Sequence, residues 1–184
     1  MSEVAALATP QQVVAFWHEA GPKRWYKKDP DFDQEIRARF LVTHEAAAAG
    51  KLRDWENTAE GALALLILLD QFPRNMFRND ARAFATDPLA RAVAAGALIK
   101  GSDSQVAAGM RGFFYLPFMH SEDLADQERA IALYKAAGDS DLRWADTHAD
   151  IIRKFGRFPH RNPVLGRKTT PEEEAFLDSG GFSG

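Results

Sequence analysis

Three short segments of this sequence each combine several side chains that could act as acids, bases or anion ligands. They are Asp70-Gln71-Phe72-Pro73-Arg74-Asn75 with Arg78 close behind, Leu116-Pro117-Phe118-Met119-His120-Ser121-Glu122-Asp123, and Phe155-Gly156-Arg157-Phe158-Pro159-His160-Arg161-Asn162. Histidine exchanges protons near neutral pH, and the arginine fork binds carboxylates and phosphates. The three segments therefore allow an acid–base pair or a site for an anion.

Asp70 directly follows the apolar run Ala62-Leu63-Ala64-Leu65-Leu66-Ile67-Leu68-Leu69. Burial raises the pKa of a carboxyl group unless a cation lies beside it. One interpretation is a base, or a group that orients an arginine, at a helix end. The other is a buried ion pair with a local arginine, which we favour because structural networks also perturb carboxylates.

His120 lies just before Ser121, Glu122 and Asp123. In a functional interpretation, His120 and one of these carboxylates form an acid–base pair or part of a metal site. In a structural interpretation, Ser121 is a helix N-cap with acids in the first turn, and His120 binds a backbone carbonyl. Capping is favoured for Glu122 and Asp123, whereas both interpretations stay open for His120.

His148 belongs to the series Trp144, His148, Ile151 and Phe155, whose spacing of four, three and four places it on the inward face of a helix. A histidine on an apolar face is more often a hydrogen-bonded core residue than a ligand. Asp146 and Asp150 flank His148, but their two-residue offsets place them on other faces of the helix, so the pattern Asp-x-His-x-Asp is not a chelate.

A basic stretch and an acidic stretch lie in the second half of the chain. Residues 151–171 contain six basic side chains and no acid, whereas residues 121–128 contain four acids and no base. Arginines between phenylalanines could bind a phosphate or a carboxylate. The economical alternative is that the two stretches bind each other, and we expect them to meet beside the helix over 58–72.

These patterns yield two sets of candidates. Those for catalysis are Asp70, His120, His148 and His160, and those for ligand binding are Arg74, Asn75, Arg78, Glu122, Arg157, Arg161 and Asn162. The five histidines lack the paired spacing of a zinc helix, and the sequence has neither a phosphate loop nor a dinucleotide-binding glycine motif. We therefore predict neither a metal nor a cofactor.

The elements that must position these residues are helices. Thr9-Pro10-Gln11-Gln12, Asp29-Pro30 and Thr170-Pro171-Glu172-Glu173 are typical helix starts. The apolar spacing predicts eight helices, over about 10–20, 30–48, 58–72, 80–99, 103–116, 121–137, 140–155 and 171–178. We expect an all-α fold of antiparallel helical hairpins around a buried helix near 58–72, with one domain over 1–178 and a flexible tail over 179–184.

Composition excludes several classes of protein. The 184 residues are 46% hydrophobic and 27% charged, carry a formal net charge of −3 and include no cysteine. This excludes a disulfide scaffold and argues against binding to nucleic acid or to an anionic membrane. The N-terminal residues do not resemble a secretory signal and no apolar run approaches about 20 residues, so we expect a cytoplasmic protein.

The segments at 68–75, 116–123 and 155–162, in this order, resemble the bacterial domain-of-unknown-function family 924. Phe16-Trp17, the stretch from Trp25 to Asp33, Trp55 and Leu165-Gly166-Arg167 fit as well, so the resemblance covers nearly the whole chain. It implies an all-helical fold similar to tetratricopeptide-like hairpins. It implies no catalytic residue, because no activity is established for that family.

Two functions remain as hypotheses. The first is a helical binding or scaffold protein that holds a protein or peptide partner in a groove between hairpins. The alternative is a small-molecule enzyme or ligand-binding protein in which the Arg, His and Asp candidates form one pocket for an anionic metabolite. The oligomeric state does not follow from the sequence.

Overall fold

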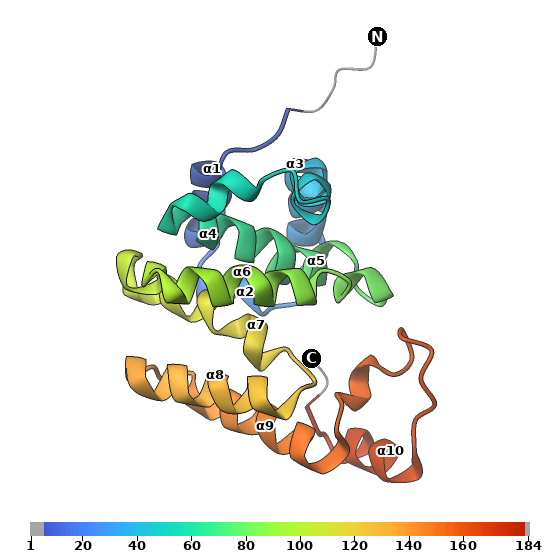
Figure 1. Cartoon of the computed structure of the whole chain (residues 1–184). Helices are drawn as coiled ribbons and strands as arrows, with labels where there is room; N and C mark the ends of the chain where they lie inside the picture. Colours follow the sequence, from blue (N-terminus) through green and yellow to red (C-terminus); the bar gives the residue numbers. More distant parts are fainter. Residues whose placement is uncertain (1–5, 183–184) are drawn as a thin grey trace. The chain divides into compact units, whose positions relative to one another are not determined.

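The computed structural model describes residues 6–182, and the all-α prediction is confirmed (Figure 1). Its helices are α1 (Pro10–Ala20), α2 (Pro22–Trp25), α3 (Pro30–Ala48), η1 (Arg53–Asn57), α4 (Ala59–Leu66), η2 (Ile67–Gln71), α5 (Phe72–Met76), η3 (Ala81–Ala83), α6 (Asp87–Ile99), η4 (Ser102–Gln105), η5 (Ala108–Phe114), α7 (Leu116–Met119), α8 (Leu124–Ala137), α9 (Leu142–Phe155), η6 (Pro159–Arg161) and α10 (Pro171–Asp178). Within residues 6–182 there is no strand, and no helix is both long and apolar enough to cross a membrane.

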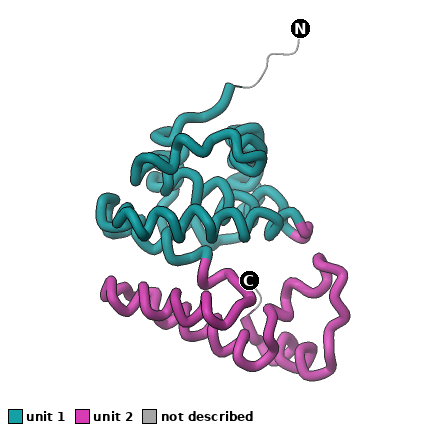
Figure 2. Tube along the Cα trace, in the orientation of Figure 1, with its two compact units in different colours: residues 1–78, 82–117 teal, residues 79–81, 118–184 magenta. Residues whose placement is uncertain are grey.

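The chain folds into two compact units (Figure 2). Unit 1 comprises the residues up to 78 together with 82–117, and unit 2 comprises 79–81 and the residues from 118 onwards. The single domain over 1–178 and the flexible tail over 179–184 stay predictions.

Three helices begin at the residues that the sequence predicts. Thr9 and Thr170 form capping boxes with Gln12 and Glu173, and the Asp29 carboxylate accepts a hydrogen bond from the Phe32 N–H. In each case a proline follows in the first turn, where its missing N–H costs no hydrogen bond.

The buried helix of unit 1 is confirmed, but it runs further than predicted. From Ala62 to Asp70 every residue is at most 3% exposed, and α1, α3 and α6 pack around this segment. The sequence predicts this helix only as far as residue 72, just before Pro73. Instead α4 passes through the π-helical turn η2 into α5, and Pro73 lies in the first turn of α5.

Side chains satisfy the carbonyl groups that the π-helical turn presents. His44 Nδ1 lies 2.8 Å from the Leu68 oxygen, the Thr86 hydroxyl donates to the Leu69 oxygen at 2.5 Å, and Arg74 donates to the Asp70 oxygen at 2.6 Å. Pro73 has no N–H with which to serve the Leu69 carbonyl, four residues earlier. A buried carbonyl without a partner is costly, so these three bonds make the continuous helix possible.

Three predicted boundaries are wrong. The helix predicted over 80–99 begins only at Asp87. Pro88 lacks an N–H and is tolerated in the first turn of a helix but not further inside it, so the helix cannot start much earlier. The helix predicted over 103–116 consists of the 3₁₀ helices η4 and η5, in a segment where Gly109 and Gly112 weaken an α-helix. The helix predicted over 121–137 begins after Asp123, which caps it in place of Ser121.

Unit 2 is built on a hairpin of α8 and α9 (Figure 1). Gly138 ends α8 and Gly156 ends α9, each with a positive φ, at 64° and 68°. That left-handed conformation suits glycine, and it lets the chain turn sharply after each helix. Small residues, Ala130, Ala145 and Ala149, are fully buried and allow close packing.

Replacing the Thr86 hydroxyl tests the role of these side-chain bonds. We expect Thr86→Val to lower the free energy of unfolding by about 1–2 kcal/mol, because it leaves a carbonyl of the buried helix without this donor. Thr147→Val is the matched control, since the Thr147 hydroxyl also donates to a backbone carbonyl but is exposed. Urea titration of both variants measures the difference, and equal losses would contradict the explanation.

Candidate functional site

The candidate residues fall into both units. Asp70, Arg74, Asn75 and Arg78 belong to unit 1, whereas His120, Glu122, His148, Arg157, His160, Arg161 and Asn162 belong to unit 2. Each group is therefore described within its own unit.

In unit 1, Arg74 is bound by two carboxylates. Its Nη1 and Nη2 atoms lie 2.9 and 3.0 Å from the two carboxylate oxygens of Asp87, in fork geometry, and Nη1 lies 3.5 Å from Asp70 Oδ1. Burial alone would lower the pKa of Arg74, but Asp87 and Asp70 outweigh it and raise the pKa above its ordinary value. The local ion pair favoured for Asp70 is thus present, and it joins α5 to the start of α6.

Asn75 and Arg78 bind one carboxylate of the same unit. Asn75 Nδ2 donates to Asp33 Oδ1 at 2.8 Å, and Arg78 donates to both Asp33 oxygens, at 2.5 Å from Nε and 2.9 Å from Nη2. Asp33 lies in the first turn of α3, so these bonds fasten α5 and the turn that follows it to α3.

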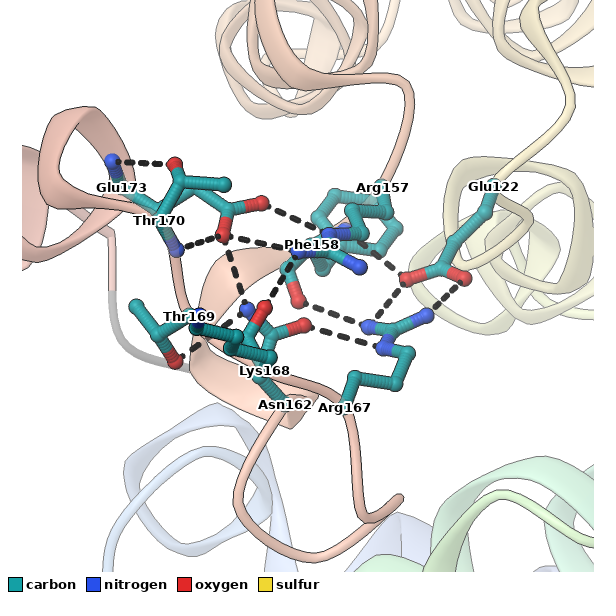
Figure 3. Close-up of polar contacts among 9 residues, drawn as sticks. All are labelled: Glu122, Arg157, Phe158, Asn162, Arg167, Lys168, Thr169, Thr170 and Glu173. Atoms are coloured by element: carbon teal, nitrogen blue, oxygen red, sulfur yellow. Dashed lines mark hydrogen bonds and ion pairs between the residues drawn. The ribbon is translucent and has the colours of Figure 1, made fainter.

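In unit 2, the acidic and basic stretches meet at Glu122 (Figure 3). Arg167 Nη1 and Nη2 donate to the two Glu122 oxygens at 2.7 and 2.9 Å, and the Phe158 N–H donates to Glu122 at 2.8 Å. Burial would raise the pKa of Glu122, but the bonds from Arg167 and Phe158 outweigh it and keep the pKa below its ordinary value. The expected meeting of the two stretches occurs within unit 2, whereas the helix over 58–72 belongs to unit 1.

A second pair in unit 2 joins Arg157 to Glu173 (Figure 3). The Arg157 fork reaches the two Glu173 oxygens at 2.6 and 2.9 Å, and these bonds are the main reason that the pKa of Glu173 falls to about 2. The buried Asn162 connects both pairs: it donates to Glu173 at 3.1 Å and accepts from Arg167 at 2.9 Å. Together these residues fix the segment between η6 and α10.

Two histidines of unit 2 contact the same two phenylalanine rings, and a third histidine lies beside one of these two histidines. The His148 ring centroid lies 6.3 Å from that of His120, 5.6 Å from Phe158 and 4.5 Å from Phe182. His160 lies 5.8 Å from Phe158 and 5.4 Å from Phe182. The structure therefore brings together three of the catalytic candidates, while Asp70 is in the other unit.

The partners within this cluster hold it in place. His148 Nδ1 lies 2.7 Å from the Trp144 carbonyl oxygen, so this nitrogen carries the hydrogen. Arg161 donates to the His120 carbonyl at 3.0 Å, and its guanidinium lies 4.5 Å from the Phe158 ring centroid. His148 is buried as predicted, whereas Trp144 in the first turn of α9 is 43% exposed.

Next to the cluster, unit 2 has an open hollow of about 270 Å³. Its lining comes from α9, α10 and the chain after α10: Thr147, Asp150, Ile151, Lys154, Phe155, Phe176 and Phe182. Phe182 belongs to both features, because its ring also contacts His148 and His160. The Phe182 ring therefore borders both the hollow and the histidine cluster.

The close approach of Gly181 to α10 brings Phe182 to this place. Gly180 has a φ of 83°, and the Gly181 N–H donates to the Phe176 oxygen at 3.0 Å. A Cβ atom on Gly181 would lie 2.5 Å from that oxygen, so the position requires glycine.

Sequence reasoning missed several residues of these arrangements. Arg167 and Glu173 hold the network of unit 2, and Asp33 and Asp87 hold the arginines of unit 1. The capping box at Thr170 was a signal for Glu173, but its pairing with Arg157 depends on the fold. Lys154, Phe176 and Phe182 of the hollow had no motif to mark them.

In the part of the chain that the structure describes, no three His, Asp or Glu side chains are placed to hold a metal ion. The arrangement offers imidazole side chains and an apolar hollow, whereas Arg74, Arg78, Arg157 and Arg167 are bound to carboxylates of their own unit.

Removing Arg74 tests whether it is structural. Arg74→Met leaves Asp70 and Asp87 buried without their cation, so we expect a loss of about 3–5 kcal/mol in the free energy of unfolding. Arg78→Met is the control, because its ion pair with Asp33 is more exposed and we expect a loss of about 1 kcal/mol. Chemical denaturation compares them, and a fully stable Arg74→Met protein would contradict the structural role.

The depressed pKa of Glu173 predicts a pH dependence of stability. The carboxylate stabilises the fold fully above its ordinary pKa of 4.5, and this contribution is lost as the pH falls from there towards about 2. We expect Glu173→Gln to destabilise the protein at pH 7 and the difference from wild type to shrink below pH 4.5. The neighbouring exposed Glu174→Gln is the control. A difference that stays constant from pH 7 to pH 3 would contradict the assignment.

Comparison with known proteins agrees with this description. A solved structure of a protein of unknown function from Agrobacterium tumefaciens is 50% identical, covers 93% of this chain and 97% of its own, and superposes with a TM-score of 0.90. No curated protein matches the chain. The family model described as bacterial protein of unknown function (DUF924) matches residues 13–181. The chain therefore belongs to the DUF924 family.

Proposed function

We propose that this protein is a binding protein whose unit 2 accepts an apolar side chain of a protein or peptide partner. The observation that carries this proposal is the hollow beside α9. Three phenylalanines and Ile151 line it, and it opens to the solvent. Such a surface suits a side chain that arrives on a larger molecule.

The size of the hollow supports a side chain over a whole metabolite. Pockets that enclose small-molecule ligands have volumes of about 300–1,000 Å³ and bury most of the ligand. The hollow has about 270 Å³ and is open on one side. It can hold one anchoring group while the rest of the partner lies on the surface.

The hydrogen bonds of the arginines support the same choice. An anion pocket would need arginines with donors directed to a ligand. Arg74, Arg78 and Arg157 direct theirs to Asp87, Asp33 and Glu173. These arginines thus fasten the fold, as in the structural interpretation of the sequence.

Two finer points complete the proposal. The hairpin of α8 and α9 would serve as a tetratricopeptide-like element, the kind that commonly presents a helix face to a peptide. We place the binding in the cytoplasm, as the absence of cysteine suggests.

The histidine cluster favours a second candidate, a small-molecule enzyme. His120, His148 and His160 could exchange protons with a substrate at the wall that Phe182 shares with the hollow. Incubation of the purified protein with a metabolite extract would identify this function: a compound consumed by wild type but not by His148→Gln would favour the enzyme.

Site-specific photo-crosslinking tests the binding function. A benzophenone amino acid replaces Thr147, which lines the hollow, and in the control it replaces Asp146, an exposed neighbour on another face of α9. In the cells of the native host, we expect position 147 and not position 146 to capture the same protein in repeated experiments. Identical products at both positions, or none at either, would contradict a partner at the hollow.

A further inference from the structure

The hollow has one charged group that is not engaged in an ion pair. Lys154 Nζ lies 4.8 Å from the centroid of Phe155 and 5.9 Å from that of Phe176. Among the described residues, no carboxylate lies within 4 Å of this ammonium. The aromatic faces hold this exposed cation at the rim of the hollow, where it can attract an anion.

The other charged residue of the lining does not offset Lys154. Asp150 Oδ1 is bound to Arg153 Nη1 at 2.8 Å on α9. The rim therefore combines apolar walls with one excess positive charge. A partner complementary to it has an apolar side chain and a carboxylate side by side.

Trp144 extends this surface along α9. Trp144, Thr147, Ile151 and Lys154 follow each other at spacings of three, four and three, which places them on one face of the helix. The rise of about 1.5 Å per residue separates Trp144 from Lys154 by about 15 Å, which an extended segment of about five residues spans. The 43% exposed Trp144 ring gives such a segment a second apolar contact.

We infer that the hollow binds a protein segment in which an apolar residue lies next to Asp or Glu, with the apolar side chain in the hollow and the carboxylate on Lys154. A second apolar residue about five positions away then covers Trp144. This inference rests on the proposed binding function, and it adds the chemistry of the partner.

Selection from a random peptide library tests the inference. A phage library of 12-residue peptides is panned against the full chain. The affinities of the enriched peptides are then measured for wild type, Lys154→Glu and Lys168→Glu. Lys168 is the matched control, because it is an exposed lysine of unit 2 outside the hollow. Thr147→Trp, which blocks the hollow from an exposed position, shows whether a peptide binds there.

We expect wild type to enrich peptides with an apolar residue next to Asp or Glu. Their affinity should fall at least tenfold with Lys154→Glu and with Thr147→Trp, and less than twofold with Lys168→Glu. Higher salt should weaken their binding to wild type.

Two other outcomes are distinguishable from each other. In the first, the Thr147→Trp variant does not bind the peptides, but the Lys154→Glu variant binds them as tightly as wild type does. This result would overturn the inference and leave the proposed function in place. If no peptide is enriched, or none responds to Thr147→Trp, both the inference and the proposed function fail.

Discussion

Pro73 lies inside the most buried helix of the chain, where it cannot donate a hydrogen bond to the Leu69 carbonyl. The helix continues past it because a π-helical turn precedes the proline and because side chains reach the carbonyls of Leu68, Leu69 and Asp70. Two of these side chains belong to other parts of unit 1: His44 comes from α3 and Thr86 from just before α6. Because the Pro73 nitrogen cannot donate, the central helix needs hydrogen-bond donors from α3 and from the residues before α6. Arg74, which donates to the Asp70 carbonyl, also binds the Asp87 carboxylate of α6, so the same part of the helix holds the buried ion pairs.

Ion pairs fasten the part of unit 2 that lies between η6 and α10. The pairs of Glu122 with Arg167 and of Arg157 with Glu173 enclose a segment with little regular structure, and the buried Asn162 connects them. Partly buried ion pairs in fork geometry gain more than exposed ones, because the surroundings screen them less. Most arginines of the basic stretch therefore bind carboxylates of unit 2 itself. What unit 2 offers to other molecules is the apolar surface beside α9.

The features that could be predicted from the sequence are local ones. Thr9 and Thr170 with the prolines behind them mark the starts of α1 and α10, because capping depends on neighbours three residues apart. The segment from Ala62 to Leu69 is buried as its uniform apolarity predicts. By contrast, the course of the chain through Pro73 depends on His44 and Thr86, which are distant in sequence. The segment over 103–116 has apolar residues at helical spacing, yet its glycines allow the tighter 3₁₀ turns.

The candidate site shows the same division. His148 was correctly placed on an inward face from its spacing, and the acidic and basic stretches do meet through Glu122 and Arg167. That the meeting involves Glu122 rather than its neighbour Asp123 follows from the cap of α8, which occupies Asp123. The hollow could not be predicted, because Lys154, Phe176 and Phe182 come together only through the turn at Gly180 and Gly181.

That turn affects how the protein should be handled. Ser179-Gly180-Gly181-Phe182 lies outside the helices of residues 6–182, so shortening the chain after Asp178 would keep each of these helices. Such a shortened protein would nevertheless lose the Phe182 ring from one side of the hollow and from the faces of His148 and His160. Its circular-dichroism spectrum would still show the full helical signal, although the hollow had lost part of its wall. Helical content is for this reason a poor guide to whether a trimmed version of this protein is intact.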